Sequence, residues 1–255
     1  YSRIREAIDD AAAGQTICVG PGNYSTSWEG GVIDVDKGVT IASTDGPGST
    51  TIGAGIKISA DEVTIEGFKI LVNAPGAGGG LEAIYLDNCK NVAIEYNEID
   101  GTGVSGQVIG IEVETGGDYS STLIENNVIH DLTTGIYTNS HTGTIDIKYN
   151  EIYNTVAGIG GLTGADVQFN KFHNNSEAVG ADDTYTSVTL TNNEFLANDM
   201  VKNYGTFVVN AENNWWGDFD PSDQVMGDVD YSPYAGGPFI GFINGQDLWL
   251  NGFAD

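Results

Sequence analysis

Four residues with acid–base side chains occupy one position of a repeated sequence pattern: Asp100, His130, Tyr153 and His173. Each comes at the end of a strand-like segment, and equivalent residues of stacked parallel strands lie about 4.8 Å apart. We therefore expect these side chains to stand next to one another. A His/Tyr/Asp group can abstract a proton beside a carboxylate, as in β-elimination or epimerisation of a uronic acid. The alternative is that the rings stack only to stabilise the fold.

A second column of aromatic and acidic residues is predicted on another strand of the repeat. Its members are Tyr85, Glu112 and Tyr137, with Asp87 two residues beyond the first. Carboxylate pairs serve glycoside hydrolysis at separations of roughly 5–5.5 Å or 6.5–9.5 Å. Aromatic rings beside carboxylates also bind sugars without catalysis, and in an acidic chain such a column can be a solvated face. The sequence leaves these three interpretations open.

Five aspartates near the end of the repeat predict a Ca²⁺ site, because hard oxygen ligands suit this ion. They are Asp218, Asp220, Asp223, Asp228 and Asp230. Their spacing does not match the EF-hand loop. No Cys/His cluster indicates zinc. Calcium is thus the one cofactor that the sequence suggests.

The elements that position these residues are predicted from a frame that is clearest in residues 188–195. There apolar and polar residues alternate, and Asn193 stands two positions before Phe195. The frame begins again at residues 63, 92, 122, 145, 165 and 209. Repeats of about 20–30 residues with strand-like alternation are typical of a β-helix, whose coils bury their apolar faces on one another. The residues expected to stack inward are Ile65, Ile94, Ile124, Ile147, Phe169 and Leu190.

Six asparagines share one place in this frame: Asn97, Asn127, Asn150, Asn170, Asn193 and Asn214. An inward Asn at a bend can bond both the backbone and the Asn of the next coil. Each bond contributes about 1 kcal/mol net, and an unpaired buried amide costs more. We interpret the column as a structural ladder.

The two ends of the chain depart from the repeat. Residues 2–13 are expected to form an amphipathic helix, capped by Ser2 and ended by Gly14, which covers the open end of the coil stack. Residues 1–234 would then form one β-helix domain. Residues 235–255 are rich in glycine and apolar side chains. This tail either caps the last coil or packs on another copy of the chain, and the second arrangement is favoured.

Composition narrows the possible partners and compartment. The net charge is −27, from 36 acidic and 9 basic residues, which excludes nucleic acid as a natural partner. No apolar run is long enough for a membrane span. The chain begins at Tyr1, which suits a processed secreted protein or a trimmed fragment. Cys18 and Cys89 fall in different predicted coils, so inert thiols are favoured over an intermolecular disulfide.

Several segments resemble a known group of proteins. AIDDAAAGQTICVGPGNY, GVTIAS, VTIEGFKI and the later NNWWG and GDVDYSPY are similar to secreted proteins of the pectin-lyase-like superfamily, within it the carbohydrate-binding and sugar-hydrolase repeats. The resemblance covers residues 1–234. It implies an all-β fold, a single-stranded right-handed parallel β-helix (solenoid) of about nine coils, and a bacterial or archaeal surface location. This fold carries lyases, hydrolases, epimerases, adhesins and structural proteins alike.

The resemblance also bears on catalysis. Polyuronate lyases of this fold usually carry Arg or Lys at the reacting centre, whereas Arg3 and Arg5 are the only arginines here and both lie in the predicted N-terminal helix. The sequence therefore favours a non-catalytic extracellular or cell-envelope protein, such as an S-layer or sheath component, that self-assembles or binds surface polysaccharide. The alternative, favoured by the His/Tyr column, is a polysaccharide-active enzyme: a uronate lyase or epimerase, or a glycoside hydrolase.

Overall fold

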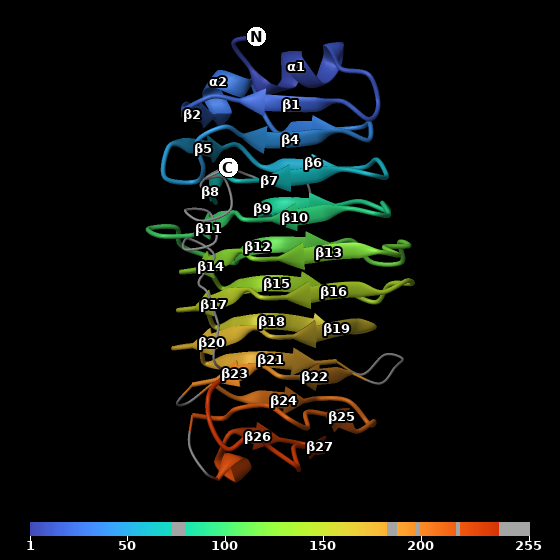
Figure 1. The fold of residues 1–255 in the computed structure, drawn as a ribbon, viewed down its shortest axis with the longest axis vertical. Helices are drawn as coiled ribbons and strands as arrows, with labels where there is room; N and C mark the ends of the chain where they lie inside the picture. Colours follow the sequence, from blue (N-terminus) through green and yellow to red (C-terminus); the bar gives the residue numbers. More distant parts are fainter. Residues whose placement is uncertain (73–79, 183–187, 197–198, 218–219, 240–255) are drawn as a thin grey trace.

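A computed structural model describes residues 1–72, 80–182, 188–196, 199–217 and 220–239. The chain forms a right-handed parallel β-helix in which three parallel sheets run along the length of the molecule (Figure 1). Eight successive coils each give one strand to all three sheets, and β25 to β27 continue the stack. The fold expected from the sequence is therefore confirmed.

The strands of each sheet follow one another from coil to coil. Sheet A contains β1 (Thr16–Val19), β4 (Thr40–Ser43), β7 (Thr64–Glu66), β10 (Ala93–Glu95), β13 (Thr122–Glu125), β16 (Ile145–Lys148), β19 (Ala165–Gln168), β22 (Thr189–Thr191), β25 (Val209–Asn210) and β27 (Val229–Asp230). Sheet B contains β2 (Gly22–Ser25), β5 (Thr50–Gly53), β8 (Lys69–Leu71), β11 (Glu98–Asp100), β14 (Val128–His130), β17 (Glu151–Tyr153), β20 (Lys171–His173) and β23 (Glu194–Phe195). Sheet C contains β3 (Ile33–Val35), β6 (Ile56–Ile58), β9 (Leu81–Leu86), β12 (Val108–Val113), β15 (Thr134–Thr138), β18 (Ala157–Leu162), β21 (Glu177–Ala181), β24 (Val201–Asn203) and β26 (Val225–Met226).

The core is a set of apolar columns, because alternate residues of each strand point into the coil. In sheet A, Ile65, Ile94, Ile124, Ile147, Val167 and Leu190 lie in register and are fully buried. The expectation that Phe169 belongs to this column is wrong. β19 ends at Gln168, and Phe169 has a left-handed backbone (φ 55°) that turns its ring outward onto Tyr149, with centroids 5.2 Å apart.

A ladder of buried asparagines follows sheet A at the bend toward sheet B. The amide of Asn150, for example, donates to the Asn170 Oδ1 at 3.0 Å and to the Ile124 carbonyl at 2.9 Å. The same side-chain bond links each successive pair from Asn97 to Asn214. These bonds hold the bend in the same geometry from coil to coil, so the strands of sheet B start in register.

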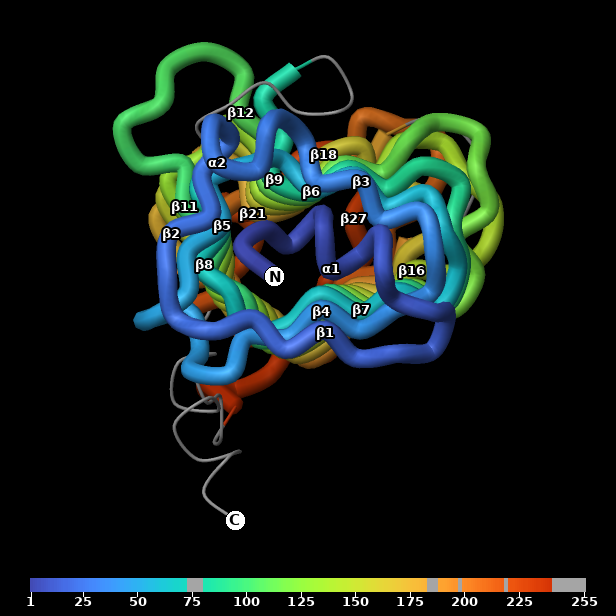
Figure 2. Tube along the Cα trace, turned by 90° about the horizontal axis from the view of Figure 1, so that it is seen from above, coloured from blue at the N-terminus to red at the C-terminus, as the bar shows by residue number. Residues whose placement is uncertain are grey.

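The N-terminal end is covered by a helix, α1 (Ile4–Asp10), which lies across the opening between the sheets (Figure 2). It is shorter than the expected range 2–13. The Ser2 hydroxyl donates to Glu6 instead of capping the helix. The cap comes from the buried Glu29 of a second helix, α2 (Thr26–Glu29), whose carboxylate accepts from the Ile4 and Arg5 amides at 3.0 and 3.2 Å.

Near the other end, a short 3₁₀ helix (Pro221–Asp223) precedes β26. The Phe239 amide donates to the Glu194 carboxylate at 2.8 Å, so the described part of the tail returns beside sheet B. The rest of the predicted tail, residues 240–255, lies outside the described residues. Within the described part of the chain, no helix is long and apolar enough to cross a membrane.

Candidate functional site

The predicted His/Tyr column forms on the outer face of sheet B. Asp100, His130, Tyr153 and His173 pair in register on adjacent strands. The His130 and Tyr153 rings stack with centroids 4.9 Å apart and planes 7° apart, and Tyr153 and His173 stack at 4.7 Å and 10°. Tyr153 is therefore covered on both faces and presents only its edge to solvent.

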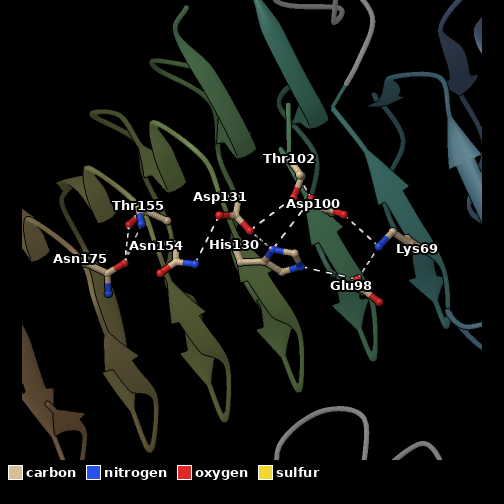
Figure 3. A network of polar contacts seen from close by, with 9 residues as sticks. All are labelled: Lys69, Glu98, Asp100, Thr102, His130, Asp131, Asn154, Thr155 and Asn175. Carbon is tan, nitrogen blue, oxygen red and sulfur yellow. Dashed lines mark hydrogen bonds and ion pairs between the residues drawn. The ribbon is translucent and has the colours of Figure 1, made fainter. Parts of the chain in front are cut away.

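Carboxylates and lysines flank this stack on both sides, and Figure 3 shows the side next to His130. Lys69 Nζ lies 2.6 Å from Glu98 and 2.9 Å from Asp100. Further along the sheet, Glu151 accepts from Lys171 at 2.9 Å and contacts His173 Nε2 at 3.1 Å. The column is thus part of a network in which charges of opposite sign are paired.

The network fixes the protonation of its members. Burial raises the pKa of Asp100, but the bonds from Thr102 and Lys69 outweigh it and lower that pKa to about 2. The bond with His173 likewise lowers the pKa of Glu151 to about 2. Burial and the charge of Glu151 raise the pKa of Tyr153. A neutral phenol at physiological pH is a poor general base, which weakens the predicted proton-abstracting role of Tyr153.

His130 is the most constrained ring of the stack. Its side chain is only 10% exposed, Nδ1 lies 2.7 Å from Asp131 Oδ2, and Nε2 lies 3.5 Å from Glu98 Oε1. Burial disfavours the charged imidazole, but the bonds to Glu98 and Asp131 outweigh it and raise the pKa of His130. The ring is therefore held between two carboxylates, with Nδ1 facing Asp131 and Nε2 facing Glu98.

A groove of about 350 Å³ opens beside His130 and Asp131, where three successive coils turn from sheet B toward sheet C. It is lined by Gly101, Thr102, Gly103, Val104, Val108, Asp131, Leu132, Thr133, Asn154 and Val156. Asp131 joins the groove to the network, because its Oδ1 accepts from Asn154 at 3.3 Å while its Oδ2 faces His130. Val156 is 59% exposed and gives the groove an apolar surface.

The second predicted column also forms, on the outer face of sheet C. Tyr85, Glu112 and Tyr137 are in register on β9, β12 and β15. Tyr85 is buried and Tyr137 is half-buried, so neither offers a fully open ring. Asp87 forms an ion pair with Lys57 at 2.7 Å.

Sequence reasoning missed Glu82, the residue that changes the chemistry of Glu112. Burial and the neighbouring carboxylate of Glu82 raise the pKa of Glu112 to about 7. Glu82 itself is 3% exposed, and its Oε2 has no hydrogen-bond partner among the residues described. Alternation did not predict the burial of Glu82, because consecutive residues of β9, including Ala83 and Ile84, are buried.

The potential metal ligands gather elsewhere than expected. In the described ranges, the group of three whose ligand atoms lie within 4.8 Å of one another is Glu98, Asp100 and His130. The late aspartates do not form such a group there, and Asp218 lies outside those ranges. Asp220 accepts from the Ser222 amide and Asp230 from the Ser232 amide; Asp223 and Asp228 complete the described set. A calcium site at these residues remains a prediction.

Both cysteines are free thiols. Cys18 is exposed and Cys89 is buried. Burial raises the pKa of Cys89 to about 12, so this thiol is unreactive at neutral pH. Intermolecular pairing through Cys18 remains an open alternative.

The fold is shared with proteins of known structure. A family model described as "Right handed beta helix region" matches residues 54–216. No curated protein matches the chain. A pectate lyase from Bacillus sp. N165, solved with trigalacturonate, is 20% identical with a TM-score of 0.53 over 90% of this chain and 75% of its own. An alginate lyase from Paenibacillus sp. str. FPU-7 is 18% identical, with a TM-score of 0.53 over 89% of this chain and 96% of its own. The pectin methylesterase from Aspergillus niger is 16% identical, with a TM-score of 0.51 over 98% and 92%. At these identities the likeness is one of fold.

Proposed function

The chain belongs to the right-handed β-helix family, and we propose that it binds a neutral polysaccharide in the groove between Thr102 and Val156, outside the cell or on its surface. The observation that carries this proposal is the composition of the groove: an exposed apolar side chain surrounded by hydroxyl, amide and carboxylate groups. Sugar-sized ligands bind in concave sites where a few fixed polar groups accompany apolar surface. Three of the similar folds carry names of carbohydrate-active enzymes, which supports a carbohydrate ligand.

The polar groups of the groove are held in place before a ligand arrives. Asp131 is fixed by His130 on one side and by Asn154 on the other. The Thr133 hydroxyl donates to the Gly106 carbonyl at 2.9 Å. Preorganised groups lower the entropy lost on binding. The groove also runs across several coils, which suits a chain-like ligand rather than a compact one.

Charge favours a neutral glycan over a polyuronate. The groove is lined by one carboxylate, Asp131, and by no lysine or arginine. The whole chain carries a net charge of −27. A polyanion would meet repulsion here without a cation to offset it. The proposed ligand therefore differs in charge from the trigalacturonate bound to the similar pectate lyase.

A binding screen with one groove variant tests the proposal. Neutral and uronic-acid polysaccharides are titrated into the full chain by isothermal calorimetry. Val156→Arg should abolish binding of the neutral ligand, because the long side chain fills the groove. Val208→Arg is the matched control, since Val208 is 51% exposed and does not line the groove. Binding that survives Val156→Arg, or binding of uronates alone, would refute the proposal.

A second candidate function is hydrolysis of the polysaccharide, and it rests on Glu112. A carboxyl group whose pKa is near 7 exchanges protons readily at neutral pH, as a general acid must. Burial of Glu112 is the larger cause of this pKa, and the buried Glu82 beside it adds to it. If the chain is an enzyme, Glu112→Gln should abolish release of reducing ends while Glu114→Gln retains it. Unsaturated products in the same assay would instead indicate a lyase.

We also propose that the chain self-associates through its apolar tail. The proposal rests on the apolar composition of residues 235–255, most of which lie outside the described residues. Deletion of residues 240–255 followed by light scattering would test it, with an unchanged mass distribution counting against assembly through this segment.

A further inference from the structure

We propose that Glu98, Asp100 and His130 form a binding site for a divalent first-row transition metal, with Lys69 as an internal competitor. The inference does not depend on the proposed polysaccharide function. It rests on the arrangement of side chains on β8, β11 and β14 shown in Figure 3.

The three side chains are close enough to share one ion. Their ligand atoms all lie within 4.8 Å of one another. Around a tetrahedral zinc with bonds of about 2.0–2.2 Å the ligand atoms are roughly 3.3–3.6 Å apart, so side-chain movements of about 1 Å complete the site once Lys69 has left it. Asp100 and His130 are in-register neighbours on adjacent strands, which fixes their backbones.

His130 is already oriented as a metal ligand. Asp131 binds Nδ1 at 2.7 Å, and the ring is stacked on Tyr153. Nε2 therefore points toward Glu98, at 3.5 Å from Oε1. Histidines that bind metals commonly hold the other ring nitrogen against a carboxylate, which fixes the tautomer and the direction of the free nitrogen.

The carboxylates around His130 carry more negative charge than the paired lysine offsets, which favours binding of a cation. Three carboxylates, those of Glu98, Asp100 and Asp131, surround the His130 ring, whereas Lys69 is the lysine paired with this group. The Lys69 ammonium contacts two of the proposed ligands, so a bound ion must displace it. The Lys69 side chain is 29% exposed and long, and it can move toward solvent. Asp100 and His130 are 8% exposed, so little water competes for their ligand atoms.

The ligand set selects the class of metal. One imidazole nitrogen and two carboxylate oxygens, with open positions for water, suit Zn²⁺ and its spectroscopic substitute Co²⁺. Ca²⁺ and Mg²⁺ prefer sites made only of oxygen ligands. The site should therefore take up Zn²⁺ in the presence of excess Ca²⁺.

The test measures metal binding directly. Zn²⁺ is titrated by calorimetry, and Co²⁺ by its visible absorption, into the full chain in buffer with excess Ca²⁺. One Zn²⁺ per chain is expected. His130→Gln should weaken binding by about tenfold or more. His173→Gln is the control, because it alters the other histidine of the same stack and should leave the affinity unchanged.

A gain of affinity distinguishes a true site from a damaged fold. Lys69→Met removes the competing charge and should tighten Zn²⁺ binding by about tenfold or more. Far-UV circular dichroism confirms that each variant is folded. The inference is overturned if neither the wild type nor Lys69→Met binds Zn²⁺, or if His130→Gln and the wild type bind it equally.

Discussion

The imidazole of His130 lies face to face with the phenol of Tyr153, with ring centroids 4.9 Å apart and planes 7° apart. The contact joins successive coils at the edge of the proposed polysaccharide groove. It restricts rotation of the His130 ring, whose Nδ1 holds Asp131 in the groove. The stack thus links the stability of the solenoid to the geometry of the site.

The first prediction separates the ring of Tyr153 from its hydroxyl. Among the described residues the hydroxyl has no hydrogen-bond partner, so Tyr153→Phe should unfold in urea like the wild type. Tyr153→Ala removes two stacking contacts and should lower the free energy of unfolding by about 2 kcal/mol. Equal losses in the two variants would show that the hydroxyl, not the ring, carries the contribution. Loss of an enzymatic activity in Tyr153→Phe would instead support the catalytic interpretation of the column.

The second prediction concerns the asparagine ladder. Asn170→Ala removes the acceptor of the Asn150 backbone N–H and the donor to the Ile147 carbonyl, and should cost about 1–3 kcal/mol of unfolding free energy. Asn23→Ala, at an exposed strand position, serves as the control and should be neutral. The comparison is made by urea unfolding. Indistinguishable midpoints for the two variants would contradict a stabilising role for the ladder.

The third prediction uses the buried carboxyl of Asp199. Burial raises its pKa to about 7 from the ordinary 3.8, although the Asn175 amide donates to it. The folded protein then binds an extra proton between these two pH values. The stability that this proton provides is therefore lost as the pH rises through the window. Asp199→Asn removes the charge and should be more stable than the wild type by roughly 1–3 kcal/mol at pH about 8, but not below pH about 4.

Unfolding curves at several pH values test this sign. Asp36→Asn, an exposed position, is the control and should show no comparable pH-dependent gain. A gain from Asp199→Asn that is the same at every pH would mean that the buried charge is not its cause.

The fourth prediction tests the Glu82–Glu112 pair. In a ¹³C NMR titration, the Glu112 carboxyl should titrate near pH 7. Glu82→Gln should lower this pKa toward the ordinary range without fully restoring it, because burial remains the larger cause. A Glu112 pKa that does not respond to Glu82→Gln would show that the two carboxyl groups do not interact.

Periodicity predicted the coil stack well because each coil repeats the same local rule. The frame placed Asn97 to Asn214 on one line and Asp100, His130, Tyr153 and His173 on another, and both lines are in register. It was misapplied at Phe169: counted from residue 165 the frame puts Val167 inward, and Phe169 takes the left-handed position that Tyr149 and Asn192 hold in the neighbouring coils.

Contacts between residues far apart in the sequence could not be predicted from the repeat. The cap of α1 by Glu29 bridges about one coil of sequence, which a local capping rule cannot see. The groove is assembled from turns of three coils, so Asp131, Asn154 and Val156 meet only once the coils are stacked. Glu82 was hidden by the irregular burial along β9. Sequence periodicity thus located the columns but not the grooves between them.

The most direct test of the central claim is hydrogen–deuterium exchange of the full chain with and without a saturating neutral oligosaccharide that binds in the screen. Binding in the groove predicts slower amide exchange in residues 101–104, 131–133 and 154–156, with little change on the outer face of sheet A. Protection confined to the Tyr85–Tyr137 column of sheet C, or no protection in the groove at saturation, would contradict the account.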